Sequence, residues 1–176
     1  IVETQSLRGT QLVNITTDTT FAAANAILAG VSGDMLEINL ELSRGLANEA
    51  GISVLRSPGA EEETVIYYKN SSKEYFVNRT KSSLNPDVEK WYQGGVADIG
   101  TENTKLHLFI DRSMVESYLN SLKGLTTRAY PTRSDAKGLQ LFANSDSNTV
   151  VVKSLQIWQM NSAYPTVNPT GVNVSP

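Results

Sequence analysis

Strict alternation of apolar residues in two stretches constrains the fold of this chain more than any other feature. Within residues 34–42, every second residue from Leu36 to Leu42 is leucine or isoleucine, and the residues between them are glutamate or asparagine. A second stretch, residues 104–110, has the same spacing of leucine and isoleucine. Because successive side chains of a strand point to opposite faces, each stretch predicts a strand with one buried face.

Seven further segments are rich in the Val, Ile, Tyr and Thr residues that favour strands. These strand candidates are residues 51–56, 64–69, 74–78, 114–119, 125–130, 138–143 and 149–160. Turn signals lie between them, at Ser57-Pro58-Gly59, Asn85-Pro86-Asp87, Gly94-Gly95, Lys123-Gly124 and residues 144–148. Short strands punctuated in this way are typical of sandwiches and barrels. The sequence therefore predicts an all-β fold, a two-sheet antiparallel β-sandwich, with residues 20–29 left open between helix and strand.

The distribution of charged and apolar residues argues against a nucleic-acid partner and against a membrane partner. The net charge is −3, and the only block of like charges, Glu61-Glu62-Glu63, is expected to be a solvated loop face. A nucleic-acid partner would need clustered Lys and Arg to neutralise phosphates, so none is predicted. No apolar run is long enough to cross a membrane, so no membrane partner is predicted either.

Four N-x-Ser/Thr sequons occur in the chain, at Asn14, Asn70, Asn78 and Asn173. Sequons are acceptors for N-glycosylation in secreted proteins. Together with abundant Thr, Ser and Asn and few Lys, they favour a glycosylated, extracellular β-protein.

Few residues are candidates for catalysis. His107, the only histidine, lies on the polar face of a predicted strand and is expected to be an ordinary strand-surface residue, with a catalytic or metal-binding role as the alternative. No second histidine and no cysteine are present to complete a zinc site. A glycosidase needs two carboxylates across the scissile bond, and the pairs with suitable spacing are Asp111 with Glu116 and Asp98 with Glu102. The alternative is structural: Asp111 follows one strand and precedes another, where a carboxylate accepts backbone hydrogen bonds. No metal site and no cofactor are predicted.

Adjacent aromatic pairs raise the question of sugar binding. Tyr67-Tyr68 and Trp91-Tyr92 must each divide between the two faces of a strand, so one member is expected in the core and the other exposed. Trp91 and Tyr92 are therefore the candidates for contact with a sugar or with another subunit. Buried aromatic side chains with a satisfied polar end are the alternative.

The second half of the chain contains a run of apolar, acidic and hydroxyl residues with a distinctive spacing. Residues 106–118, LHLFIDRSMVESY, have the spacing L-x-x-F-x-D-x-S-x-x-E-x-[FY]. This stretch resembles one in the C-terminal β-sandwich of glycoside hydrolase family 32, which includes invertases, levanases, inulinases and fructan exohydrolases. Residues 128–131 (RAYP), 138–143 (GLQLFA) and 155–160 (LQIWQM) follow in the family's order. Near the start, residues 6–9 (SLRG) are similar to the linker that leaves the catalytic propeller. Residues 10–100 match mainly in their strand pattern.

This resemblance implies a division of the chain and a set of partners. Residues 1–9 would be the linker from a missing upstream catalytic domain, residues 10–160 the sandwich, and residues 161–176 an irregular C-terminal tail. The family's catalytic motifs, similar to N-D-P-N-G, R-D-P and E-C, do not occur here, so no residue of the chain is expected to be catalytic. Asp111, Arg112, Ser113 and Glu116 would instead form a turn and a polar network of the sandwich.

Three functions remain open at this point. The first is a non-catalytic module that stabilises a β-fructofuranosidase, docks on its β-propeller and, in some family members, contacts a second copy in a homo-oligomer. The second is a carbohydrate-binding module for fructan. The third is an independent hydrolase that uses Asp111 and Glu116.

Overall fold

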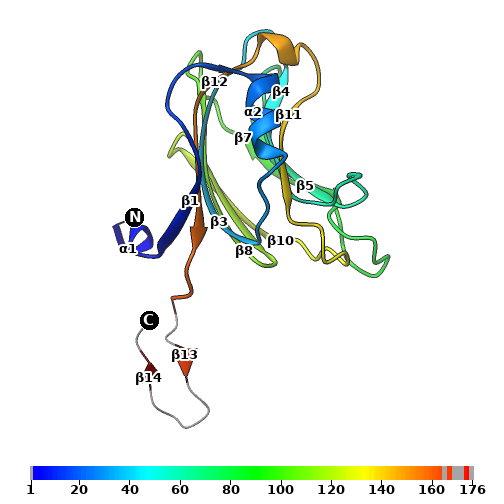
Figure 1. Cartoon of the computed structure of the whole chain (residues 1–176). Coiled ribbons are helices and arrows are strands. Elements are labelled where there is room, and N and C mark those ends of the chain that lie inside the picture. The colour runs from blue at the N-terminus through cyan, green and yellow to red at the C-terminus, as the bar shows by residue number, and fades with distance from the viewer. Residues whose placement is uncertain (1, 164–165, 168–172, 175–176) are drawn as a thin grey trace.

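The computed structural model describes residues 2–163, 166–167 and 173–174, and it confirms the two-sheet antiparallel β-sandwich (Figure 1). The first sheet has the order β1-β12-β3-β8-β9-β10, with β2 beside β12. Its strands are β1 (Arg8–Ile15), β2 (Thr19–Thr20), β3 (Met35–Ser43), β8 (Thr104–Asp111), β9 (Met114–Leu119), β10 (Lys123–Arg128) and β12 (Val151–Met160).

The second sheet has the order β11-β4-β5-β6-β7. Its strands are β4 (Glu49–Arg56), β5 (Glu63–Lys69), β6 (Glu74–Lys81), β7 (Tyr92–Val96) and β11 (Gly138–Ala143). The remaining elements are α1 (Val2–Gln5), α2 (Phe21–Leu28), the short 3₁₀ helix η1 (Ser147–Thr149) and a separate pair of two-residue strands, β13 (Thr166–Val167) and β14 (Asn173–Val174). None of the described helices has the length and apolar character to span a membrane.

The alternating stretches form the centre of the first sheet. β3 pairs with β8 from Met35 opposite Asp111 to Leu42 opposite Thr104, without a register shift. The even-numbered side chains from Leu36 to Leu42 are at most 2% exposed, and they join the inward side chains of the second sheet in one core cluster. Register is well specified here because a shift by one residue would turn every apolar side chain outward.

All nine strand candidates are found, but three strands of the sandwich are missing from the sequence prediction: β1, the two-residue β2 and β7. β1 begins at Arg8, inside the stretch assigned to a linker, and its pairing with β12 is shifted twice, which breaks the two-residue period. β7 contains Gly94-Gly95, which was predicted as a turn. The turn signal at Lys123-Gly124 was also wrong, since both residues belong to β10.

The segment left open, residues 20–29, forms the helix α2. Thr20 caps its start, accepting a hydrogen bond from the Ala23 N–H at 3.2 Å, and Ala24 and Leu28 are buried. The Asn25 Oδ1 accepts the Leu141 N–H at 2.7 Å, so the helix covers part of the otherwise free edge of β11. A protected edge strand cannot recruit a further strand from another chain.

Candidate functional site

The outward face of the first sheet carries a buried charge cluster formed by Arg8, Glu37 and His107. Glu37 lies on β3, and only 1% of its side chain is exposed. Its carboxylate accepts hydrogen bonds from Nε and Nη2 of Arg8, each at 2.7 Å, and lies 2.8 Å from Nε2 of His107. The two partners come from β1 and β8, so the cluster links residues 29 and 70 positions away from Glu37 in the sequence.

Aromatic rings surround this cluster. The Arg8 guanidinium stacks on the ring of Trp158 at 3.9 Å, and the ring of His107 lies 4.5 Å from that of Phe109. Trp158 and Phe109 are the residues directly opposite Glu37 on the two neighbouring strands. Their rings shield the ion pair from water, which strengthens it and fixes its geometry.

Electrostatics keep Glu37 ionised in spite of its burial. Burial raises the pKa of the carboxyl group, but the hydrogen bonds and charges of Arg8 and His107 lower it more, so that the pKa lies below its ordinary value of 4.5. The carboxylate in turn raises the pKa of Arg8. His107, expected to be an ordinary residue of a strand surface, is thus a hydrogen-bond partner of a buried carboxylate.

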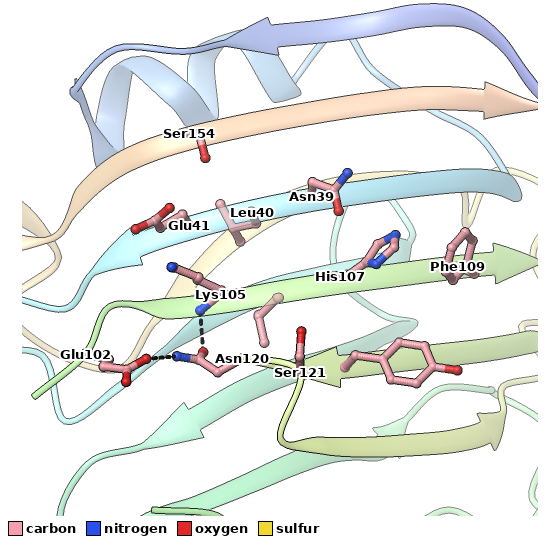
Figure 2. Close-up of a pocket in the computed structure, with 12 residues that line it drawn as sticks. Asn39, Leu40, Glu41, Glu102, Lys105, His107, Phe109, Asn120, Ser121 and Ser154 are labelled. Carbon is pink, nitrogen blue, oxygen red and sulfur yellow. Dashed lines mark hydrogen bonds between the residues drawn. The ribbon is translucent and has the colours of Figure 1, made fainter. Parts of the chain in front are cut away.

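An open groove of about 620 Å³ lies next to the cluster, over β12, β3, β8 and β9. Figure 2 shows His107 and Phe109 along β8, with Glu41, Lys105 and Asn120 at the other end of the groove. Asn120 accepts the Lys105 N–H at 2.8 Å and donates to a carboxylate oxygen of Glu102 at 3.2 Å (Figure 2). The groove is therefore polar at one end and aromatic at the other.

A second hollow, of about 250 Å³, continues the groove toward the N-terminal segment. The two hollows share Phe109 and Tyr118, and the second is also lined by Thr4 and Leu7. The segment before β1 and the segment after β12 therefore border the same outward face of the first sheet. A concave, partly aromatic surface of this kind is suited to contact with another folded surface.

The residues predicted to form a turn and polar network lie at the end of this face. The turn between β8 and β9 has Arg112 at a φ of 52°, and its N–H donates to the Asp34 carbonyl. The Asp111 carboxylate pairs with Nη1 of Arg112 at 3.1 Å, and the Ser113 Oγ accepts from Nη1 of Arg128 at 3.0 Å. Glu116 is half-buried and borders the second hollow.

The other predicted carboxylate pair has separate partners. Asp98 pairs with Nζ of Lys73 at 2.6 Å, whereas Glu102 accepts from Asn120. Among the side chains that the structure describes, no three His, Asp or Glu residues gather in a way that would hold a metal ion.

The expectation of a solvated face at Glu61-Glu62-Glu63 was wrong for Glu62. This side chain is fully buried, and its carboxylate accepts hydrogen bonds from the N–H groups of Leu84, Thr132 and Arg133 and from the Thr132 hydroxyl, at 2.7–2.9 Å. Burial raises the pKa of Glu62, but the hydrogen bonds from these four donors lower it by more than burial raises it. The pKa of Glu62 therefore lies below its ordinary value of 4.5. Three loops are thus tied to a single carboxylate.

Trp91 and Tyr92 are both exposed, at 52% and 55%, so the expected division into one core and one surface residue fails for this pair. Trp91 precedes β7, where strand alternation does not yet apply, and its ring lies 5.9 Å from the Arg79 guanidinium. In the pair Tyr67-Tyr68 the two side chains do point to opposite faces of β5, but both are buried: Tyr68 is in the core cluster and Tyr67 is only 6% exposed, so the expected exposed member is missing here too.

The sequons lie at the surface where their side chains are described. Asn14 and Asn70 are exposed and Asn78 is half-buried on the outward face of β6. Asn173 lies in β14, and its side chain is outside the described part of the chain.

Sequence reasoning missed Arg8, Glu37 and Trp158 as members of a site. Glu37 is one of several acids on the polar side of an alternating strand, and no local pattern distinguishes it from Glu41. A signal existed in the resemblance, since Arg8 belongs to the SLRG stretch and Trp158 to the LQIWQM stretch.

The sequence profile of the family described as "Glycosyl hydrolases family 32 C terminal" matches residues 3–159 of this chain. The levanase of Bacillus subtilis (strain 168) is 32% identical over 173 residues, covering 94% of this chain and 24% of that protein. The acid beta-fructofuranosidase 2, vacuolar, of a Rosa hybrid cultivar is 35% identical over 131 residues, covering 69% of this chain and 20% of that protein. The chain thus spans about a quarter or less of these relatives.

Solved structures share the fold. The structure of fructan 1-exohydrolase IIa from Cichorium intybus superposes with a TM-score of 0.75 at 17% identity, over 93% of this chain and 37% of that chain. The exo-inulinase from Aspergillus awamori superposes with a TM-score of 0.69 at 21% identity, over 92% of this chain and 31% of that chain. At these identities the likeness establishes the sandwich fold alone.

Proposed function

The chain belongs to the C-terminal domain family of glycosyl hydrolases family 32, and from this premise we propose that it is the non-catalytic sandwich of a β-fructofuranosidase. In this role it stabilises the enzyme and docks on the catalytic β-propeller upstream. The single observation that carries the docking role is the outward face of the first sheet, where the Arg8–Glu37–His107 cluster adjoins two hollows.

Two features of this face support docking. The charges of Arg8 and Glu37 are already paired within the chain, so covering them costs less than burying unpaired charges. The N-terminal segment lines the second hollow through Thr4 and Leu7, so a domain that precedes residue 1 would start beside this face. A short connection between neighbouring domains favours a stable contact.

The reaction belongs, in this proposal, to the upstream domain. It would be hydrolysis or transfer of β-fructofuranosyl units from sucrose or fructan by two carboxylates of the propeller. Levanase and beta-fructofuranosidase are the names of the two relatives above. Secretion, glycans on the sequon asparagines and a contact with a second copy are parts of the same proposal. The division into a linker (1–9), a sandwich (10–160) and a tail (161–176) also stays a proposal.

The first test is release of reducing sugar from sucrose, inulin and levan. We expect the purified 176-residue chain to be inert and a longer protein that includes the upstream sequence to be active, because the chain lacks the family's catalytic motifs. Steady turnover by the isolated chain, abolished in Asp111→Asn or Glu116→Gln variants that keep their fold, would establish the independent hydrolase instead.

The docking face has its own test in the longer protein. Tyr118 is 36% exposed and lies where the two hollows meet, whereas Val96 is 71% exposed on β7 of the other sheet. In the longer protein we expect Tyr118→Lys to lower the melting temperature by at least about 4 °C, because a charge would be buried in the contact. Val96→Lys should have little effect.

The isolated chain supplies the control for this comparison, since there Tyr118 faces water. Both variants should leave its melting temperature nearly unchanged. Equal effects of Tyr118→Lys in the two proteins would mean that the residue acts inside the sandwich, and the proposed docking face would then be wrong.

A further inference from the structure

A ladder of four aromatic rings crosses the outward face of the second sheet, on the far side of the sandwich from the proposed docking face. The ring centroids of Phe142 and Tyr67 are 5.4 Å apart, those of Tyr67 and Phe76 are 5.7 Å apart, and those of Phe76 and Tyr92 are 6.3 Å apart. The rings belong to β11, β5, β6 and β7. Their neighbours Tyr68, Tyr75 and Leu141 are in the core cluster, so the four rings point away from it.

Two glycines make the ladder continuous. Gly51 of β4 lies opposite both Phe142 and Tyr67, and with no side chain there the two rings meet across β4. Gly94 of β7 lies opposite Phe76, and a Cβ at this position would come within 2.6 Å of the Phe76 Cδ1. The Phe76 ring therefore lies over the backbone of β7. Aromatic rings that cover glycines on adjacent strands are held in place by the sheet.

The surroundings of the ladder favour an uncharged ligand. The Glu49 carboxylate, which acts on Tyr67, is paired with Nζ of Lys69 at 3.2 Å, so the negative charge of Glu49 is neutralised by the positive charge of Lys69. Burial, together with Glu49, Tyr92 and Glu74, raises the pKa of the Tyr67 hydroxyl to about 12, so this group stays protonated and can donate a hydrogen bond. A nucleic-acid strand, which also stacks on aromatic rings, would need a basic groove that this chain of net charge −3 does not offer.

Neutral saccharides match this combination of groups. The C–H faces of a sugar ring pack on aromatic rings, and its hydroxyls pair with tyrosine hydroxyls and carboxylates such as those of Tyr67 and Glu74. Tyr92 is 55% exposed, Phe76 and Phe142 are half-buried and Tyr67 is 6% exposed, so successive units of a saccharide chain would contact mainly Phe142, Phe76 and Tyr92. Because the rings are already ordered by their glycine neighbours, binding loses little side-chain entropy.

We propose that the outward face of the second sheet binds a neutral saccharide chain along the ladder of Phe142, Tyr67, Phe76 and Tyr92. This inference adds a binding site to the docking role and uses the opposite face, so one can fail without the other. Tyr92 was a sequence candidate for sugar contact, whereas Trp91, whose ring contacts Arg79, is not part of the ladder.

The test uses the 176-residue chain produced without glycosylation. Its migration in native gels is measured with increasing soluble levan, inulin or dextran, and Kd is obtained by titration calorimetry with the polysaccharide that retards it. We expect saturable binding of at least one of them. Tyr92→Ala and Phe76→Leu should each weaken it at least about threefold, because each removes one stacking contact.

Tyr130→Ala is the matched control, since Tyr130 is 46% exposed but lies in the loop between β10 and β11, outside the ladder. Far-ultraviolet circular dichroism verifies that each variant is folded. The proposal is overturned if none of the three polysaccharides binds, or if Tyr130→Ala weakens binding as much as Tyr92→Ala. It is also overturned if sedimentation shows a dimer that Tyr92→Ala dissociates, because the ladder would then be a contact between two copies.

Discussion

Replacing Glu62 by glutamine is expected to lower the free energy of unfolding of this chain by about 3–5 kcal/mol. The buried carboxylate accepts hydrogen bonds on both of its oxygens, one of them from the N–H of Arg133. The amide of glutamine has one acceptor oxygen and one NH₂ group. The NH₂ group would therefore face a donor at the position of one of the two carboxylate oxygens. For a domain of this size, such a loss corresponds to a fall in melting temperature of roughly 6–20 °C.

Urea denaturation of wild type and Glu62→Gln measures this difference directly, and Glu61→Gln is the matched control. Glu61 is the adjacent residue, it is exposed, and its carboxylate accepts one hydrogen bond, from the Ser57 hydroxyl. Its replacement should leave the free energy of unfolding nearly unchanged. Similar losses in the two variants would show that the Glu62 network does not stabilise the loops.

Replacing Glu37 by glutamine is expected to cost about 2–4 kcal/mol at pH 7, with the cost shrinking in acid. The variant leaves the Arg8 guanidinium without its buried counter-charge and removes the carboxylate oxygen beside Nε2 of His107. Because the pKa of Glu37 is lower in the folded chain than its ordinary value of 4.5, the unfolded chain binds more protons just below that pH. The contribution of Glu37 is therefore complete above about pH 4.5 and is lost as the pH falls through the folded-state pKa.

Urea midpoints at several pH values between 7 and 3 test this expectation. The wild type and Glu37→Gln should differ most at pH 7 and approach each other toward pH 3. Glu41→Gln is the control on the same face of β3, where the carboxylate accepts from Asn103 and is half-exposed. A difference between wild type and Glu37→Gln that stays constant over the whole range would contradict the ionised, buried state of Glu37.

Both glutamates escaped sequence reasoning for the same physical reason. A carboxylate becomes buried when donors from other segments converge on it, and those donors lie far away in the sequence. Glu62 is bound by residues 22, 70 and 71 positions later, and Glu37 by residues 29 positions earlier and 70 positions later. The aromatic ladder is equally non-local, since only Tyr92 of its four rings was a candidate.

The sequence by itself determined the sandwich, because strand periodicity is a property of consecutive residues. The alternation from Leu36 to Leu42 specifies which face is buried, and the turn signal at Asn85-Pro86-Asp87 lies between strands as expected. The same local logic failed at Gly94-Gly95, where a ring from β6 occupies the space over a glycine and a strand forms instead of a turn. Only the tertiary structure decided where Arg8, Glu37 and His107 meet and how the ladder crosses five strands. These contacts depend on strand order and register, which bring together residues that are far apart in the sequence. The residues next to each of them in the sequence do not indicate these contacts.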